Sequence, residues 1–411
     1  MNLYKSMAIV LISALTITSY SCNKDEEEDV DDQGPTPEEQ NLSGSYDDLH
    51  LTNIYEDPSM VDYTVKGDID FAGTLTIDPG VKIEFEEDTE LHITSTGIFK
   101  AIGSSDHPII FTSAEIAGGK HWKGIRINST DIRNEISHAV VEYAGNSKIS
   151  LGTFNSHNTE TNIAVNDDAV LTINHTEISN SKNFGLYVRG TLKEHNDNNY
   201  KSNGNAALGT HIRNVDVIDD ATTFSDNIFN GVDIRLGGTL THQATWTQLH
   251  ESGEYKVSDD ILIAAPLTIH EGCFFNIDED VLINVFDDDN TTSDSYIEVK
   301  GTQNMPVVFT TSNLAGGRHW KGIVVKTPDA RNKMDYVTIE YAGNSDINIG
   351  AFNSQNRATN LAADSEATLS ISNANIKHSK GWGIAAIADA NLTLENIDYE
   401  GNAEGDLDYG D

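Results

Sequence analysis

Cysteine, proline and basic residues are all scarce in this sequence of 411 residues. The two cysteines, Cys22 and Cys273, cannot build a disulfide framework. Only eight prolines stand beside 32 glycines, in a chain rich in Val, Ile, Thr, Asn and Asp. That composition favours many short strands joined by turns.

Positive charge is the second deficit, because 26 Lys and Arg residues face 65 Asp and Glu residues, for a formal net charge of −39. A nucleic acid or an anionic lipid surface would be repelled by such a chain, so neither is expected as a partner. Cations and neutral sugars remain open as ligands.

The first 21 residues have the parts of a secretion signal. Lys5 supplies positive charge, residues 7–17 form an apolar stretch too short for a comfortable membrane span, and Cys22 follows. A Cys at this place resembles the lipidated first residue of a bacterial lipoprotein, although Ser19 stands where Leu is usual. Ordinary secretion with an incidental Cys is the alternative.

An acidic stretch, residues 22–45, follows the signal and contains the run Asn23-Lys24-Asp25-Glu26-Glu27-Glu28-Asp29. It has no apolar periodicity, and we expect a disordered tether. A Lys and a run of acids just after the Cys resembles the export signal of Bacteroidota surface lipoproteins. The resemblance implies a lipid anchor on Cys22 in the outer membrane and exposure at the cell surface, whereas the simpler alternative is a solubilising spacer.

One nine-residue stretch occurs twice, as residues 117–125 (AGGKHWKGI) and 315–323 (AGGRHWKGI), 198 positions apart. The same displacement relates residues 142–147 to 340–345, so a long segment is duplicated. Before it, the alternation that starts at Tyr63 and Val65 returns at Tyr255 and Val257 after 192 residues. The six additional residues are assigned to a polar loop at 286–294.

A shorter period runs inside both copies, with Ile178, Ser181 and Gly185 spaced like Phe224, Asn227 and Gly231. Together with phrases such as LTIDPGV (75–81), PIIFT (108–112) and VVEY (140–143), this resembles the right-handed parallel β-helix family, and more narrowly the repeat surface lipoproteins of Bacteroidota. The predicted fold is therefore an all-β, right-handed parallel β-helix (β-solenoid) built from two tandem related halves, residues 46–256 and 257–411. About 16 coils of about 22 residues would form a rod of roughly 75 Å.

Three segments are expected to depart from the regular coils. Residues 41–60 are predicted to cap the amino end, and the polar run 194–200 is predicted to protrude as a loop. Residues 211–218 and 224–234 are predicted to resume the coil pattern.

The repeated His-Trp-Lys stretch is the first candidate site. His121, Trp122 and Lys123, with His319, Trp320 and Lys321, could form two sugar-binding platforms, because an indole face suits the apolar face of a sugar. The interpretation we favour is structural: Trp turns inward, Gly124 or Gly322 permits a bend, and His and Lys face water.

Acidic clusters suggest a second kind of chemistry. Lyases on this fold hold Ca²⁺ with carboxylates from adjacent coils, and the possible donors are Asp167, Asp168, Asp219, Asp220 and Asp287, Asp288 and Asp289. Among so many acids, adjacency is expected by chance, and a solvated loop explains 287–294 as well as a Ca²⁺ site does. Neither a Gly-His-Gly nor a His-Glu-x-x-His motif is present. Asn180, Asn227 and Asn230 are expected to form a hydrogen-bonded ladder.

These observations favour a surface-anchored, non-catalytic binding or structural rod without a required cofactor, in contact with a polysaccharide or a host glycan or matrix. The alternative is a polysaccharide lyase or glycoside hydrolase on the same scaffold.

Overall fold

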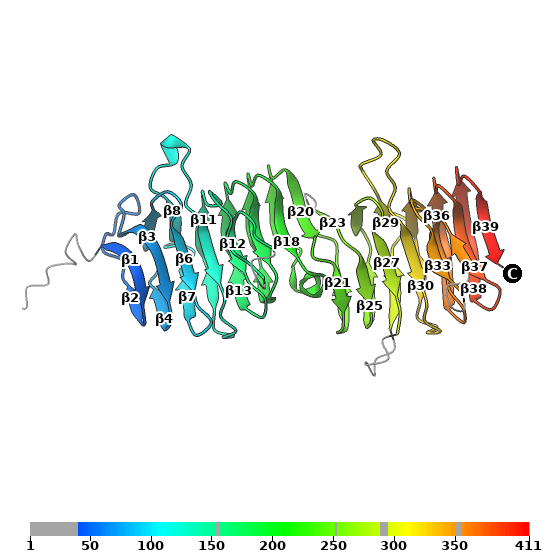
Figure 1. The fold of residues 1–411 in the computed structure, drawn as a ribbon, viewed down its shortest axis with the longest axis horizontal. Helices are drawn as coiled ribbons and strands as arrows, with labels where there is room; N and C mark the ends of the chain where they lie inside the picture. The colour runs from blue at the N-terminus through cyan, green and yellow to red at the C-terminus, as the bar shows by residue number, and fades with distance from the viewer. Residues whose placement is uncertain (1–39, 153–156, 251–252, 288–294, 351–354, 411) are drawn as a thin grey trace, which may run out of the picture.

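The chain forms a long all-β solenoid of stacked parallel strands, as a computed structural model shows for residues 40–152, 157–250, 253–287, 295–350 and 355–410 (Figure 1). Strands from successive coils pair in parallel register and form columns along the rod. This confirms the predicted parallel β-helix architecture. The segments 1–21 and 22–39, with Cys22, lie outside the described residues.

One column, here called the central column, runs through the whole described rod. It consists of β1 (Asn41–Tyr46), β3 (Tyr63–Phe71), β6 (Glu90–Ile93), β9 (Gly124–Ile127), β12 (Thr161–Val165), β15 (Phe184–Val188), β18 (Ala206–Thr210), β20 (Phe229–Ile234), β23 (Glu254–Val257), β26 (Phe274–Ile277), β29 (Val307–Thr310), β32 (Val337–Glu340), β36 (Thr368–Lys377) and β38 (Asn391–Glu400). These 14 strands make 13 steps of about 4.8 Å, or roughly 62 Å. The sequence-based estimate of 16 coils is too high, because several coils carry long loops.

Two further columns complete the coils of the amino-terminal half. One consists of β2 (Leu49–Leu51), β4 (Thr74–Ile77), β7 (Ile98–Ile102), β10 (Glu135–Ser137), β13 (Val170–Asn174) and β16 (Thr191–Asn196). The other consists of β5 (Lys82–Phe85), β8 (Ile109–Ser113), β11 (Ala139–Glu142), β14 (Glu177–Ser179), β17 (Asn199–Lys201) and β19 (Thr223–Ser225).

The carboxy-terminal half also has two columns beside the central one. One consists of β22 (Ala244–Trp246), β25 (Pro266–His270), β28 (Tyr296–Lys300) and β31 (Lys333–Asp335), and it joins β36 and β38. The other consists of β21 (Gly238–Leu240), β24 (Ile261–Ile263), β27 (Leu282–Val285), β30 (Gly322–Val325), β35 (Thr359–Ala363), β37 (Trp382–Ile387) and β39 (Gly405–Gly410). A hairpin of β33 (Ile347–Ile349) and β34 (Gln355–Arg357) is antiparallel.

The core fills the inside of the coils. Alternate side chains of most strands point inward, as in β5 and β26, where buried and half-buried residues alternate. Like residues stack on like: Phe275 lies on Phe309 with ring centroids 4.8 Å apart. Cys273 is buried there, and burial raises the pKa of its thiol to about 12.

The duplicated halves join with a displacement of one column. β9 and β30 begin within the two copies of the repeated stretch, yet β9 lies in the central column and β30 lies in the neighbouring one. The change of column occurs where Val232 of β20 pairs with Tyr255 of β23. Tyr255 is the residue that corresponds to Tyr63 in the first half. Nevertheless, the loop between β8 and β9 and the loop between β29 and β30 project from the same side of the rod (Figure 1).

The sequence-based prediction for residues 194–200 is wrong, and residues 211–218 resume the coil stack in an altered form. Residues 194–200 do not protrude: they include the end of β16 and the start of β17, with His195 and Tyr200 fully buried. The two polar groups satisfy each other, because His195 Nε2 lies 2.8 Å from the Tyr200 hydroxyl. Residues 212–217 form a 3-10 helix, η3 (Ile212–Val217), in place of a strand, and Ile212 and Val215 pack inward.

The amino end is a coil rather than a separate cap. β1 pairs with β3 and β2 pairs with β4, and Leu42 and Leu51 are buried. The following turn is held by Asp62, whose carboxylate accepts hydrogen bonds from the backbone amides of Ile54 and Lys82.

Candidate functional site

Both tryptophans of the repeated stretch are buried in the solenoid core. The exposed fraction of Trp122 and of Trp320 is zero, and each indole nitrogen donates a hydrogen bond of 2.8 Å to a backbone carbonyl, that of Glu142 or Glu340. A sugar cannot stack on either indole. The glycines that follow, Gly124 and Gly322, have φ values of 132° and 137°, where a side chain would be strained.

The histidines of the stretch are half-buried at the corner before β9 and β30. Nδ1 of His121 lies 3.0 Å from the carbonyl oxygen of Ala144, and Nδ1 of His319 lies 3.1 Å from that of Ala342. Burial lowers the pKa of each imidazole, more than the hydrogen bond raises it. The two corners are thus built alike, and the loops that precede them project from the same side of the rod (Figure 1).

The lysines that follow differ between the halves. Lys123 Nζ lies 3.1 Å from a carboxylate oxygen of Glu90, and Arg126 Nε lies 2.8 Å from the other oxygen. Strand register shows that Leu282 and Val324 take the places of Glu90 and Arg126 in the second half. Lys321 keeps its place without an ion pair to any residue that the structure describes.

A hollow of about 570 Å³ lies where the two halves meet, beside η3. It is lined by Lys193, Glu194, Asn196, Asp216, Val217, Ile218, Asp219, Asp220, Thr245 and Thr247. Carboxylates of successive coils therefore line one hollow together with one lysine. This is the arrangement that the enzyme alternative requires.

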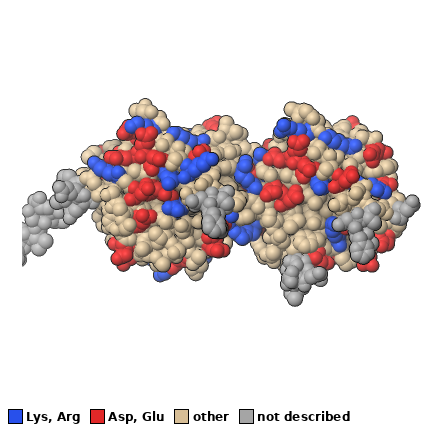
Figure 2. Space-filling view, in the orientation of Figure 1, with Lys and Arg blue, Asp and Glu red and all other residues tan. Residues whose placement is uncertain are grey.

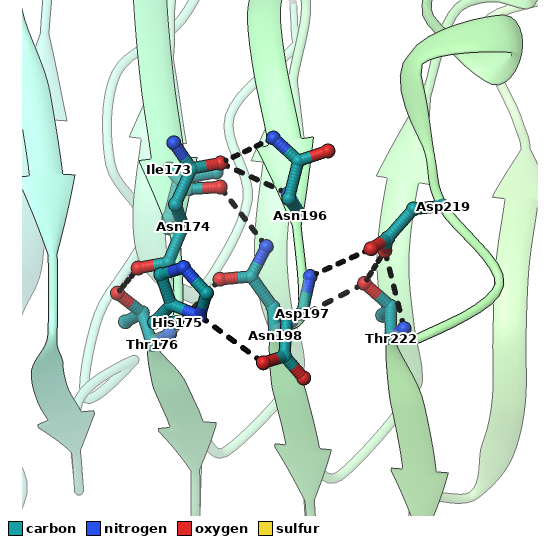
Figure 3. A network of polar contacts seen from close by, with 9 residues as sticks. All are labelled: Ile173, Asn174, His175, Thr176, Asn196, Asp197, Asn198, Asp219 and Thr222. Atoms are coloured by element: carbon teal, nitrogen blue, oxygen red, sulfur yellow. Dashed lines mark hydrogen bonds and ion pairs between the residues drawn. The ribbon is translucent and has the colours of Figure 1, made fainter. Parts of the chain in front are cut away.

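Hydrogen bonds within the chain occupy part of this acidic set (Figure 3). Asp219 accepts from the backbone amides of Asp197 and Thr222 and from the Thr222 hydroxyl. Asp216 lies 3.3 Å from His242 Nε2. Glu194 accepts a hydrogen bond from Asn174 Nδ2 at 3.5 Å. Among the described residues, Asp220 is therefore the carboxylate of the hollow that these contacts leave for a ligand.

The other predicted acids are separated from this hollow. Asp167 pairs with Arg189 at 2.9 Å, and Asp287 accepts a hydrogen bond from the Ser295 amide. Asp288 and Asp289 lie outside the described residues. Within the described ranges, no group of three or more His, Cys, Asp or Glu side chains is placed to hold a metal ion.

An asparagine ladder is present, but Asn203 belongs to it in place of the predicted Asn180. Asn227 Nδ2 donates to Asn230 Oδ1 at 3.0 Å, and Asn203 Nδ2 donates to Asn227 Oδ1 at 2.8 Å. Asn180 lies at a left-handed corner with φ 54° and bonds to the Ser179 hydroxyl instead. The ladder satisfies buried backbone groups, so its role is structural.

Sequence reasoning missed the exchange of Glu90 for Leu282, although the signal was available. The displacement of 192 residues that relates Tyr63 to Tyr255 also relates Glu90 to Leu282. Comparison of the two copies at that displacement shows a buried acid replaced by an apolar residue beside a retained lysine.

The part of the chain that the structure describes contains no helix that is long and apolar enough to span a membrane. Comparison of the chain with protein-family models, with curated proteins and with solved structures gives no match.

Proposed function

We propose that this chain is a lipid-anchored rod displayed at the surface of the outer membrane, where it binds glycans or matrix without catalysis. The observation that carries this proposal is the repetition of one corner on one side of the rod. Seven pairings along the central column lead from β9 to β29, so the two corners stand roughly 35 Å apart along the axis.

The face on which the corners lie is polar and mixed in charge. In both halves, acidic side chains gather on the visible face below the projecting loop, with basic side chains among them (Figure 2). An extended polymer laid along this face would meet the same pattern twice, and simultaneous contact with both halves raises the apparent affinity.

The proposed localisation rests on the sequence of residues 1–40, with Cys22 as the lipidated residue. Replacement of Cys22 by Ser should release the chain from the membrane fraction. External protease should degrade the wild-type chain on intact cells. Full protection of the wild-type chain from protease would contradict surface display.

A glycan array followed by a product assay tests the binding function. Binding without new unsaturated or reducing ends is the expected result. The double variant H121A/H319A separates structure from recognition, because lost thermal stability with retained binding would assign the histidines a structural role.

The second candidate is a carbohydrate-active enzyme that works in the hollow between the halves. The observation in its favour is that Glu194, Asp220 and Lys193 line the same hollow. If the product assay detects cleavage, the variants E194Q and D220N should abolish it, and the binding proposal then fails.

A further inference from the structure

A small pocket in the second half lies over β27 and β30, on the outer surface of the solenoid. Its volume is about 170 Å³, and it is lined by Leu282, Asn284, Lys321, Val324, Lys326, Ile347 and Asn348. Three of these residues are apolar, and the others are two lysines and two asparagines. In the first half, β6 pairs with β9 in the same register in which β27 pairs with β30 in the second half.

The first half fills the corresponding place with its own carboxylate. Glu90, opposite Gly124 in the strand register, is only 5 % exposed at its side chain and contacts Lys123 and Arg126. In the second half the residue opposite Gly322 is Leu282, which carries no charge. The second half therefore retains the lysine, as Lys321, but lacks the carboxylate that pairs with the lysine in the first half.

The polar groups of the pocket are incompletely used. Lys326 pairs with Asp364 at 3.2 Å, whereas Lys321 has no ion pair with a described residue. The Oδ1 atom of Asn284 is buried and accepts no hydrogen bond from the described part of the chain. At the same register of the first half, both ring nitrogens of His92 are engaged, by Asp70 at 2.6 Å and by Asn128 at 3.0 Å. A ligand that offers an anion and a hydroxyl donor would satisfy both groups.

We propose that this pocket binds a sugar unit that carries a carboxylate, an inference that rests on the proposed glycan-binding function. The ligand carboxylate lies on Lys321, where the Glu90 carboxylate lies on Lys123. The apolar face of the sugar ring packs on the half-buried Leu282. The Asn284 side chain turns to bring its buried Oδ1 to the pocket, where a ring hydroxyl donates to it, because a buried acceptor without a donor is costly.

The net charge of the chain favours a ligand with a single carboxylate over a polyanionic one. A chain of charge −39 repels a polyanion. Mobile ions screen that repulsion beyond roughly 8 Å at physiological ionic strength, so one carboxylate beside Lys321 is tolerated. A single terminal acidic sugar should therefore bind more tightly per carboxylate than a continuous polyuronate.

The test is calorimetric titration of the full chain with glucuronate and galacturonate, with glucose and galactose as neutral controls. K321M keeps the packing of the lysine stem but removes the charge, and uronate affinity should fall at least about tenfold. L282E places an internal carboxylate beside Lys321, as Glu90 does beside Lys123, and should block the pocket. K123M is the matched control in the first half and should leave the affinity unchanged.

Equal binding of glucose and glucuronate, or unchanged uronate affinity in K321M, would overturn the inference. Thermal melting by circular dichroism verifies the fold of each variant, and K321M alone decides if L282E does not fold. Binding of neutral glycans only on the array removes this inference and leaves the proposed function standing. Binding of no glycan at all removes this inference together with the glycan-binding form of the proposed function.

Discussion

Trp122 donates a hydrogen bond from its indole nitrogen to the backbone carbonyl oxygen of Glu142 at 2.8 Å, and its ring stacks on Phe85 with centroids 4.0 Å apart. The bond joins one coil to the next, since Trp122 precedes β9 and Glu142 ends β11. In the second half Trp320 and Glu340 repeat it at the same distance. The repetition of this tryptophan thus follows from coil packing.

Replacement of either tryptophan by Phe should lower stability without changing ligand binding. The Phe variant keeps most of the apolar contact but leaves a buried carbonyl without its donor, which costs about 1–3 kcal/mol in the free energy of unfolding. Urea denaturation followed by circular dichroism measures this loss for W122F and W320F. Unchanged stability, together with weakened glycan binding, would restore the sugar-platform interpretation.

The buried imidazole of His195 predicts a fall in stability with acid. Burial lowers the pKa of His195 from its ordinary 6.5 to about 4, because the charged form loses its hydration. The unfolded chain therefore takes up this proton first as pH falls. The contribution of neutral His195 is complete above pH 6.5 and is lost between pH 6.5 and 4, by roughly 3 kcal/mol across that range.

Urea denaturation of the wild-type chain and of H195F at several pH values between 7.5 and 4.5 tests this prediction. H195F loses the hydrogen bond to Tyr200 at every pH, but its stability should fall less steeply with acid than that of the wild type. Parallel curves for the two proteins would show that His195 does not titrate with unfolding.

Asn203 links three coils and should be the most sensitive member of the ladder. Its side chain accepts from the Ser181 amide and donates to the carbonyl of Ile178 and to Asn227. N203A leaves buried backbone groups unpaired, so a loss of about 2–4 kcal/mol is expected in urea denaturation.

The matched control for Asn203 is N180G. Asn180 has φ 54°, which Gly adopts without strain, and its side chain contacts only the Ser179 hydroxyl among the described residues. This variant should lie within about 0.5 kcal/mol of the wild type. Equal losses in N203A and N180G would argue against a special role of the ladder.

The architecture was predictable because inward and outward residues alternate with period two and recur from coil to coil. Tyr63 and Val65, with their counterparts Tyr255 and Val257, are buried as that pattern requires. The alternation says nothing about which column a strand joins. The displacement of the second half by one column depends on the pairing of Val232 with Tyr255. The order of these two segments along the chain does not determine which of their residues pair.

The segment 194–200 shows why polarity misleads within a solenoid. Glu194 and Asn196 face outward, and only alternate positions need to be compatible with the core. His195 meets that need through Tyr200, a partner that composition does not reveal. The candidate pocket was hidden for a similar reason: Lys123 and Lys321 are identical in sequence, and the difference lies in residues 33 and 39 positions earlier, Glu90 and Leu282.

Glu90 provides the last prediction, because it separates a structural ion pair from a binding site. The variant E90Q leaves Lys123 and Arg126 as partly buried cations without their counter-charge, and we expect a loss of about 2 kcal/mol in urea denaturation. The double variant E90L/R126V copies the second half, where Leu282 and Val324 pack at the same registers. Apolar replacement of a whole buried ion pair is often neutral, so the double variant should regain most of the stability that E90Q loses. It also frees Lys123, and a second uronate should then bind to the chain in calorimetry. Full stability in E90Q would mean that the ion pair contributes nothing to the fold, and would remove the reason for regarding Glu90 as the internal counterpart of a ligand.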